Sequence, residues 1–329
     1  MVGEGDSARI FVGADRSQLI AVKVLEYSIR RRTSLPISLR STHDLELPEP
    51  KDPRQGKRTG FSFVRFAVPE LAGHQGRAVY LDADMLVLRD FRELWGLPFD
   101  GAKVIIQEGI PDAAQPVGKL GAPNKRIKQC SVMLMDCAAL DWEPRSIIAG
   151  LGERYTYEQL VYELCLLNEQ DVNYGVPFVW NSLEHYDAGK TGLIHYTDML
   201  TQPWVNPDNR NGFVWHDEVR AMLADGAMTY GEIEQEIALG YLRPSLVVEL
   251  REIEPGRALT SQEIKRLNAI DNAGGFVMHK DVYAAKRRRQ EAIRTYEKSL
   301  GISVSPLTRA ADTLQRAGLL SSLRRRLGV

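Results

Sequence analysis

The first 214 residues show a repeated order of apolar run, turn and helical pattern. Residues 8–15 form an apolar run that ends at a turn containing glycine, and apolar positions in residues 19–29 follow with the spacing of one helix face. Further apolar runs predict strands at 35–41, 102–107, 130–137, 176–180 and 193–196, and helical patterns occupy 61–71 and 146–168. Strands that alternate with helices predict an α/β fold built around a buried sheet.

Residues 77–88 are the most unusual stretch of the chain. Two apolar runs flank Asp82 and Asp84, which are two positions apart. A buried strand does not tolerate two unpaired carboxylates, because an isolated charge out of water is very costly. Either the strand ends there with solvated carboxylates, or a cation lies between them. Because alternate residues of an extended chain point to the same side, Asp82 and Asp84 can converge on one ion.

The pattern changes after residue 214. Residues 216–300 are mainly helical in pattern, so we expect a domain at 1–214 and a helical C-terminal region at 215–329. Residues 280–329 contain 12 Lys and Arg but only 4 Asp and Glu, while the rest of the chain is acidic. The basic amphipathic stretch 307–327 is typical of a helix on an anionic membrane surface, and equally of a helix packed on the protein body.

Composition narrows the class of protein. The 42 basic and 43 acidic side chains nearly balance, so nothing in the totals indicates nucleic-acid binding. Three cysteines in apolar contexts fit reduced thiols in a cytosolic protein. We find neither a secretory signal nor an apolar run that could span a membrane, and therefore expect a cytoplasmic protein, either free or peripheral at the inner face of the membrane. Homo-oligomerisation remains open.

Other polar residues stand at the ends of predicted strands, where α/β sheets bind ligands. Asp15 follows the first strand and is either a helix cap or a contact for a nucleotide base or ribose. Arg65 lies on an apolar helix face, where it either snorkels to water or reaches the carboxylates. Residues 108–128 form a long Gly/Pro-rich loop with a basic end at Lys128, typical of an active-site lid. His195 ends a short apolar run, and two carboxylates with an imidazole suit Mn²⁺ or Mg²⁺.

Several blocks in order give a named resemblance. Residues 63–71, 79–87 and 93–95 resemble the signature of family 8 glycosyltransferases, the relatives of glycogenin and of bacterial lipopolysaccharide glycosyltransferases. Residues 129–136 resemble the family's Asn-Ser-Gly-Val-Met-Leu block, and residues 169–173 resemble its Asp-Gln-Asp-x-x-Asn block. The block from His195 to Trp204 resembles its His-x-x-Gly-x-x-Lys-Pro-Trp.

The resemblance implies a GT-A fold, a Rossmann-like nucleotide-sugar-binding fold with a mixed central sheet. It implies transfer of a hexose from a nucleotide-sugar, usually a UDP-sugar, to an acceptor hydroxyl with retention of anomeric configuration. Asp82, Asp84 and His195 would hold Mn²⁺ or Mg²⁺, and Gln170, flanked by Glu169 and Asp171, would lie beneath the anomeric carbon. The implied donor-binding positions are Ala14, Asp15, Arg65, Asp82, Ala83, Asp84, Lys128 and Trp204. The acceptor would be a sugar, a lipid-linked glycan or a small molecule.

The chain departs from the family pattern at several positions. Gln18 falls near the position of the aromatic residue that stacks on uracil, and Gln202 replaces the Lys before Pro-Trp. These departures leave two alternatives open: a sugar nucleotidyltransferase, or a non-catalytic module that binds a sugar nucleotide or a membrane. Because Gln170 is a neutral amide and a poor nucleophile, we favour same-face attack by the acceptor, assisted by the departing phosphate.

Overall fold

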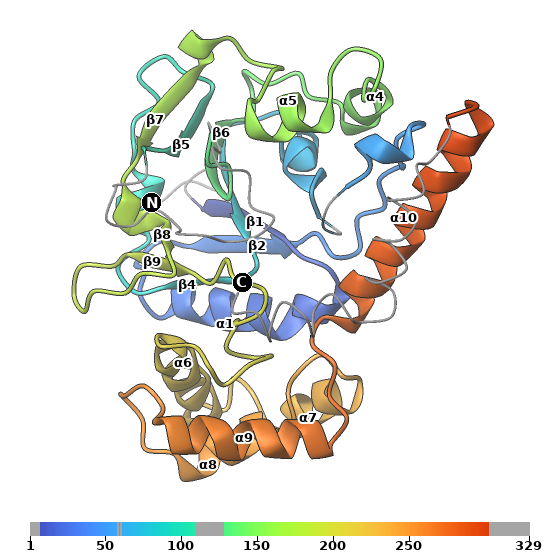
Figure 1. The fold of residues 1–329 in the computed structure, drawn as a ribbon. Helices are drawn as coiled ribbons and strands as arrows, with labels where there is room; N and C mark the ends of the chain where they lie inside the picture. Colours follow the sequence, from blue (N-terminus) through green and yellow to red (C-terminus); the bar gives the residue numbers. More distant parts are fainter. Residues whose placement is uncertain (1–6, 58, 60, 110–127, 303–329) are drawn as a thin grey trace.

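A six-stranded mixed sheet forms the centre of the computed structural model, which describes residues 7–57, 59, 61–109 and 128–302 (Figure 1). Its strand order is β2-β1-β3-β6-β5-β7. The strands are β1 (Ala8–Gly13), β2 (Ile37–Ser41), β3 (Arg77–Asp82), β5 (Val104–Gln107), β6 (Val132–Asp136) and β7 (Val172–Val176). The β1 strand is parallel to both of its neighbours, whereas β6 is antiparallel to β3 and β5. The predicted α/β class with a mixed sheet is confirmed.

A second sheet has three strands in the order β4-β9-β8. They are β4 (Met85–Val87), β8 (Ser182–Leu183) and β9 (Leu193–His195). The chain passes from the first sheet to the second between Asp82 and Met85, so the predicted strand end at the two carboxylates is confirmed. Asp82 and Asp84 therefore lie where the two sheets meet.

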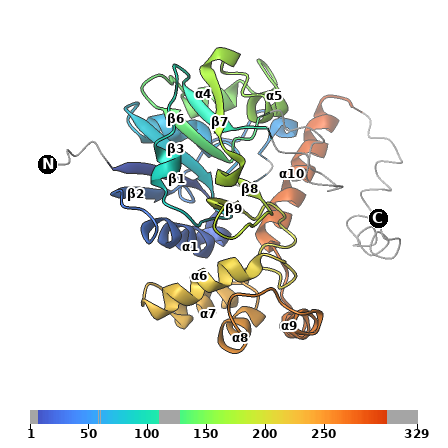
Figure 2. The same ribbon diagram turned by 90° about the vertical axis from the view of Figure 1, so that its left-hand side faces the viewer.

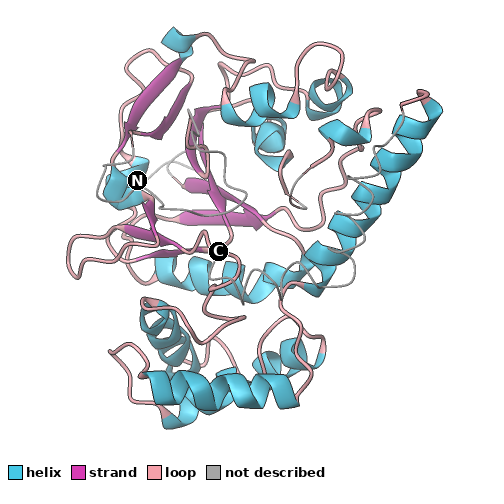
Figure 3. Cartoon of the chain, in the orientation of Figure 1, coloured by secondary structure: helices cyan, strands magenta, loops and turns pink. Residues whose placement is uncertain are grey.

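Helices cover both faces of the central sheet (Figures 1 and 3). The amphipathic helix α1 (Leu19–Arg30) and the short α3 (Arg92–Trp95) cover one face. The other face is covered by α2 (Val68–Leu71), α4 (Pro144–Ala149) and α5 (Tyr157–Tyr162). Along β3, Val79 and Leu81 pack in the first core, and Ala78 and Tyr80 pack in the second. This alternation places Tyr80 and Asp82 on the same side of β3.

The C-terminal helices form a layer beyond α1 and then return to the central sheet (Figure 2). They are α6 (Gly212–Ala224), α7 (Tyr230–Ala238), α8 (Ser245–Glu252), α9 (Ser261–Ala273) and α10 (Lys280–Ser299). The first three share a third core with α1 and β4. The mainly helical C-terminal region is thus confirmed up to residue 302, whereas the boundary at residue 214 stays a prediction. None of the helices that the structure describes is long and apolar enough to span a bilayer.

Two local predictions were wrong, and a third is confirmed in part. The helix expected at 146–168 is two short helices, because Gly152 adopts a left-handed φ of 83° between them. The strand expected at 176–180 lies earlier, at 172–176, and Pro177 follows it because proline has no N–H for the sheet. The helical pattern at 61–71 forms a 3-10 turn at Val64–Ala67 before α2. The basic stretch 307–327 and most of the 108–128 loop lie outside the described residues.

Candidate functional site

Asp82, Asp84 and His195 converge at the junction of the two sheets. One ligand atom from each residue lies within 4.8 Å of the other two. Two backbone contacts join their strands, because Met85 pairs with His195 and the Tyr196 N–H donates to the Asp84 carbonyl at 2.8 Å. The structure thus brings together the three residues predicted to bind a metal, although they come from opposite halves of the described chain.

Hydrogen bonds fix how His195 faces Asp84. Nδ1 of His195 is 2.9 Å from Oδ1 of Asn181, and the Asn181 amide nitrogen donates to Ser131 Oγ at 3.0 Å. Because Asn181 Oδ1 can only accept, Nδ1 carries the hydrogen and the lone pair of the neutral ring lies on Nε2. Nε2 is 3.0 Å from Asp84 Oδ1, a buried oxygen with no hydrogen-bond partner in the described structure.

Two facing acceptors in a buried site require a cation between them. A proton is one solution: burial lowers the pKa of His195, but the Asp84 carboxylate outweighs burial and holds that pKa above its ordinary value. A divalent ion is the other, and the set of one imidazole and two carboxylates fits Mn²⁺ or Mg²⁺. The orphaned Asp84 oxygen and the oriented His195 nitrogen are therefore consistent with a metal site.

Asp82 has a different environment from Asp84. The Tyr80 hydroxyl donates to Asp82 Oδ1 at 2.7 Å, and Arg65 Nη2 lies 3.7 Å from the same oxygen. Burial raises the pKa of Asp82, and the Arg65 charge opposes that rise. Arg65 is itself buried, with its guanidinium 4.9 Å from the Tyr80 ring centroid and Nη1 donating to the Cys130 carbonyl at 2.8 Å. Arg65 thus reaches the carboxylates and does not snorkel to water.

A glycine makes this arrangement possible. Gly13, at the end of β1, pairs with Asp82 across the sheet. A Cβ atom at Gly13 would lie 2.1 Å from the Tyr80 hydroxyl, far inside contact distance. The absence of a side chain at Gly13 therefore lets Tyr80 reach Asp82.

A pocket of about 220 Å³ opens beside the three predicted ligands. Its walls include Asp15, Gln18, Arg65, Lys128, Gln202 and His279. Asp15 begins the 3-10 turn Arg16–Gln18, where its Oδ1 accepts from the Ser17 N–H at 2.9 Å. Both interpretations of Asp15 are thus compatible, because it caps a helix and also lines the pocket. Ala14, Ala83 and Trp204 are buried, and Trp204 packs against Trp215, with ring centroids 5.6 Å apart.

None of the three predicted catalytic residues is among the described residues that line this pocket. Gln170 and Asp171 belong to the 3-10 turn Glu169–Asp171, which leads into β7. The start of β7 pairs with the start of β5, which in turn pairs with β6. The same part of β6 pairs with Ala78 of β3, so the block lies level with Ala78 across the sheet. Ala78 and Asp82 are separated by roughly 13 Å along β3. Figure 1 shows this end of β7 remote from β4. The catalytic roles of Glu169, Gln170 and Asp171 stay predictions.

Glu169 contacts the pocket wall in the part of the chain that the structure describes. Lys128 Nζ lies 2.9 Å from Glu169 Oε2, and Lys128 is buried in the wall. Asp171 points instead to Lys103, whose Nζ lies 3.5 Å from Asp171 Oδ1. The structure therefore connects Glu169 to the candidate site through Lys128, and connects Asp171 to the start of β5.

Gln202 takes a role that the sequence did not predict. Its Nε2 donates to Asp84 Oδ2 at 2.9 Å and to the Tyr196 carbonyl at 3.0 Å. The residue that replaces the family's lysine thus supports a predicted metal ligand. The roles of Tyr80 and Asn181 also went unpredicted. The spacing of Tyr80, two residues before Asp82, was a usable signal, whereas nothing in the sequence pointed to Asn181.

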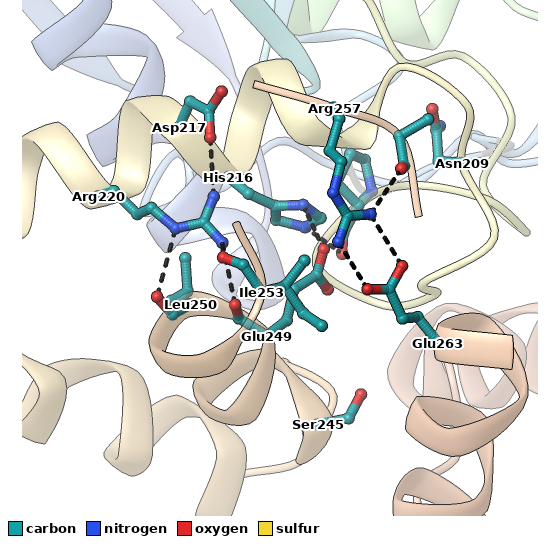
Figure 4. Close-up of polar contacts among 12 residues, drawn as sticks. Asn209, His216, Asp217, Arg220, Ser245, Glu249, Leu250, Ile253, Arg257 and Glu263 are labelled. Carbon is teal, nitrogen blue, oxygen red and sulfur yellow. Dashed lines mark hydrogen bonds and ion pairs between the residues drawn. The ribbon is translucent and has the colours of Figure 1, made fainter. Parts of the chain in front are cut away.

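Buried charges in the C-terminal helices anchor the segment that carries Gln202. Arg243 donates through Nε to the Pro203 carbonyl at 3.1 Å and through its backbone N–H to the Trp204 carbonyl at 3.0 Å. Glu249 on α8 pairs with Arg243, and its Oε1 lies 2.8 Å from His216 Nδ1 on α6. Figure 4 shows His216 directed at Glu249, and Arg220 of α6 directed at the end of α8.

Comparison with known proteins shows a family similarity over the first part of the chain. Residues 16–133 match the model of glycosyl transferase family 8. This segment contains Arg65, Asp82 and Asp84. Protein CDI of Arabidopsis thaliana is 27% identical over 219 residues, which cover 64% of this chain and 80% of that protein. Over these residues the chain is similar to family 8 glycosyltransferases, the family that its ordered motifs resemble.

Solved glycosyltransferase structures are also similar at low sequence identity. GlyE of Streptococcus pneumoniae TIGR4 is 15% identical, with a TM-score of 0.45 over 73% of this chain and 65% of that one. The galactosyltransferase LgtC, solved with donor and acceptor sugar analogs, is 14% identical, with a TM-score of 0.40 over 64% of this chain and 94% of that one. The bifunctional WbbM is 13% identical, with a TM-score of 0.42. The match covers 67% of this chain and 50% of the WbbM chain.

Proposed function

We propose that this glycosyltransferase uses Mn²⁺ or Mg²⁺ to transfer a hexose from a UDP-sugar to an acceptor hydroxyl, with retention of anomeric configuration. The observation that carries the metal dependence is the convergence of Asp82, Asp84 and His195 in one pocket wall. The UDP donor and the retention rest on the family resemblance. The acceptor class remains a sugar, a lipid-linked glycan or a small molecule.

In this proposal different side chains bind different parts of the donor. Asp82, Asp84 and His195 would hold the divalent ion, which when bound stabilises the negative charge that develops on the departing diphosphate. Arg65 supplies a fixed positive charge next to Asp82, held by the Cys130 carbonyl. Asp15 lines the same pocket and would accept a hydrogen bond from the nucleobase.

Residues around the ligands keep these groups in place. Gln202 and Asn181 orient Asp84 and His195, and Tyr80 orients Asp82. Such supporting partners typically change metal affinity by 10–100-fold when they are lost. For Gln170 we retain the predicted contact with the donor sugar as a proposal that rests on the motif alone, because Gln170 is not among the described residues that line the pocket.

The test is a donor panel. The wild-type protein is incubated with UDP-, GDP- and dTDP-hexoses, with and without Mn²⁺, and donor hydrolysis and thermal shift are recorded. We expect Mn²⁺-dependent hydrolysis of a UDP-hexose, and loss of that activity in Asp84→Asn. The matched control is Asp187→Asn, which removes an exposed carboxylate paired with Lys190.

Two outcomes would contradict the proposal. Undiminished hydrolysis by Asp84→Asn would remove the metal assignment, and an inverted anomer in the NMR spectrum of the transfer product would remove the retaining assignment. Release of pyrophosphate from UTP and a sugar phosphate would instead indicate a nucleotidyltransferase.

A further inference from the structure

His279 is a strained residue in the wall of the pocket. It immediately precedes α10 and adopts a left-handed φ of 48°, which is uncommon for any residue other than glycine. Its side chain is buried but makes no hydrogen bond that caps α10. Capping therefore does not explain why a histidine occupies this backbone conformation. Backbone strain of this kind is characteristic of ligand sites.

The contact that the imidazole makes determines which of its nitrogens is left as an acceptor. Nε2 lies 2.6 Å from the Met199 carbonyl, and because a carbonyl only accepts, Nε2 carries the hydrogen. Burial lowers the pKa of His279, so the ring is neutral near pH 7 and Nδ1 holds a lone pair. Nδ1 has no hydrogen-bond partner among the residues that the structure describes. Such a nitrogen accepts a hydrogen bond from an O–H or N–H donor.

The helix that follows His279 contacts the rest of the protein at two places. Lys280 lies over the Tyr241 ring, 5.3 Å from its centroid. Further along the helix, Arg289 donates to the carbonyls of Pro53 and Arg54 at 3.2 and 2.8 Å. Val282, one turn into α10, lines the pocket together with His279. His279 therefore stands at the start of a helix that is anchored to the rest of the protein, and such support favours specific recognition.

The position of His279 indicates which hydroxyl it meets. The pocket contains Asp15, proposed to contact the base, and Asp84, proposed to hold the metal on the diphosphate. His279 lines the same pocket, and the charges of both carboxylates raise its pKa against the effect of burial. In a nucleoside diphosphate, the group between base and diphosphate is the ribose. We propose that His279 Nδ1 accepts a hydrogen bond from a ribose hydroxyl of the donor nucleotide. This inference rests on the proposed function and adds a preference for ribonucleotides over deoxyribonucleotides.

The first experiment compares nucleotides on the wild-type protein. Calorimetric titrations with Mn²⁺ measure the Kd of UDP, 2′-deoxy-UDP and 3′-deoxy-UDP. We expect one of the two deoxy compounds to bind about tenfold more weakly than UDP, as the loss of one hydrogen bond in a desolvated site predicts. Equal affinity for all three would overturn the assignment. If UDP itself does not bind, the proposed donor fails instead, so the two failures are distinguishable.

The second experiment changes the side chain and keeps the backbone. His279→Gly tolerates the left-handed conformation and lacks an acceptor, whereas His279→Asn also tolerates it and places an amide oxygen near the Nδ1 position. We expect the glycine variant to lose the discrimination and the asparagine variant to retain it. Discrimination that persists in His279→Gly would overturn the proposal. Because each protein is its own reference across the nucleotides, a modest change in stability does not affect the conclusion.

Discussion

Tyr80 donates its hydroxyl hydrogen to Asp82 across a distance of 2.7 Å, from the neighbouring position on the same side of β3. Both this bond and the nearby Arg65 guanidinium involve Asp82 Oδ1. Oδ2 has no hydrogen-bond partner among the described residues and is the oxygen that remains for a cation. Tyr80 thus fixes one oxygen of the Asp82 carboxylate and leaves the other oxygen available to bind a cation.

Tyr80→Phe should weaken Mn²⁺ binding by about tenfold, because Asp82 loses the bond that orients it. The Kd for Mn²⁺, followed by electron paramagnetic resonance, measures the effect. Tyr155→Phe is the control, since it removes a comparable bond from a tyrosine hydroxyl, here to the Ile147 carbonyl at 2.7 Å, away from the site. Equal Mn²⁺ affinity in wild type and Tyr80→Phe would contradict the role given to Tyr80.

Gly13→Ala should lower both stability and Mn²⁺ affinity. The new Cβ would lie 2.1 Å from the Tyr80 hydroxyl and 2.8 Å from its ring carbon Cζ, so the tyrosine must move away from Asp82. Overpacking of this kind typically costs about 1–3 kcal/mol. Urea denaturation and Mn²⁺ titration check the two effects. Gly231→Ala is a suitable control, because its Cβ would meet nothing closer than 3.9 Å and lies within α7, where alanine favours the helix.

Asn181→Ala should reduce Mn²⁺ affinity by about 10–100-fold, because His195 loses the acceptor that fixes its orientation. Ser131→Ala removes only the outer bond, at 3.0 Å from the Asn181 amide, and should have a smaller effect. Calorimetric titration of both variants with Mn²⁺ gives the comparison. A larger loss in Ser131→Ala than in Asn181→Ala would mean that Asn181 does not act through His195.

Acid should selectively weaken the C-terminal helices. Burial raises the pKa of Glu249, but His216 and Arg243 outweigh burial and hold that pKa at about 2. A lowered folded-state pKa stabilises the protein above the ordinary value for glutamate, and this contribution is lost as the pH falls from there toward 2. The shift corresponds to roughly 3 kcal/mol at neutral pH.

The measurement is the free energy of unfolding of wild type and Glu249→Gln at several pH values. The wild-type advantage should be large at pH 7 and should shrink steadily below about pH 4.5. Glu234→Gln, which removes an exposed partner of Arg251, should change little at any pH. A wild-type advantage that does not depend on pH would contradict the charge-based explanation.

Much of the fold and part of the site could be predicted, because periodic burial and local chemistry leave traces in sequence. Asp82 and Asp84 stood out because charged residues interrupt an otherwise apolar run, and His195 because it ends one. For Arg65 the sequence allowed two opposite predictions, exposure to water or contact with the carboxylates. Only the path of its side chain past Tyr80 distinguishes them. The prediction of one helix at 146–168 was wrong because the left-handed turn at Gly152 interrupts an apolar pattern that otherwise continues.

Other site residues left no local signal. Asn181 and Gln202 act through bonds to residues far along the chain, at separations that no periodicity encodes. His279 belongs to the C-terminal region, and in the pocket wall it contacts the Met199 carbonyl, 80 residues earlier in the chain. Gln170 was predicted to be catalytic because its neighbours in sequence resemble a family motif. The position of that motif in space depends instead on the register of the sheet, which the motif does not reveal.

The backbone ladder that joins Asp84 to β9 has a consequence for how the protein responds to chelators. Met85 and His195 are paired, and Tyr196 bonds to Asp84, so backbone hydrogen bonds join the segments that carry two of the predicted ligands. The ligands are thus held by the sheet and not gathered by an ion. A chelator should therefore abolish the proposed transfer activity while the circular dichroism spectrum and cooperative melting persist, unlike in zinc-finger domains, which unfold without metal.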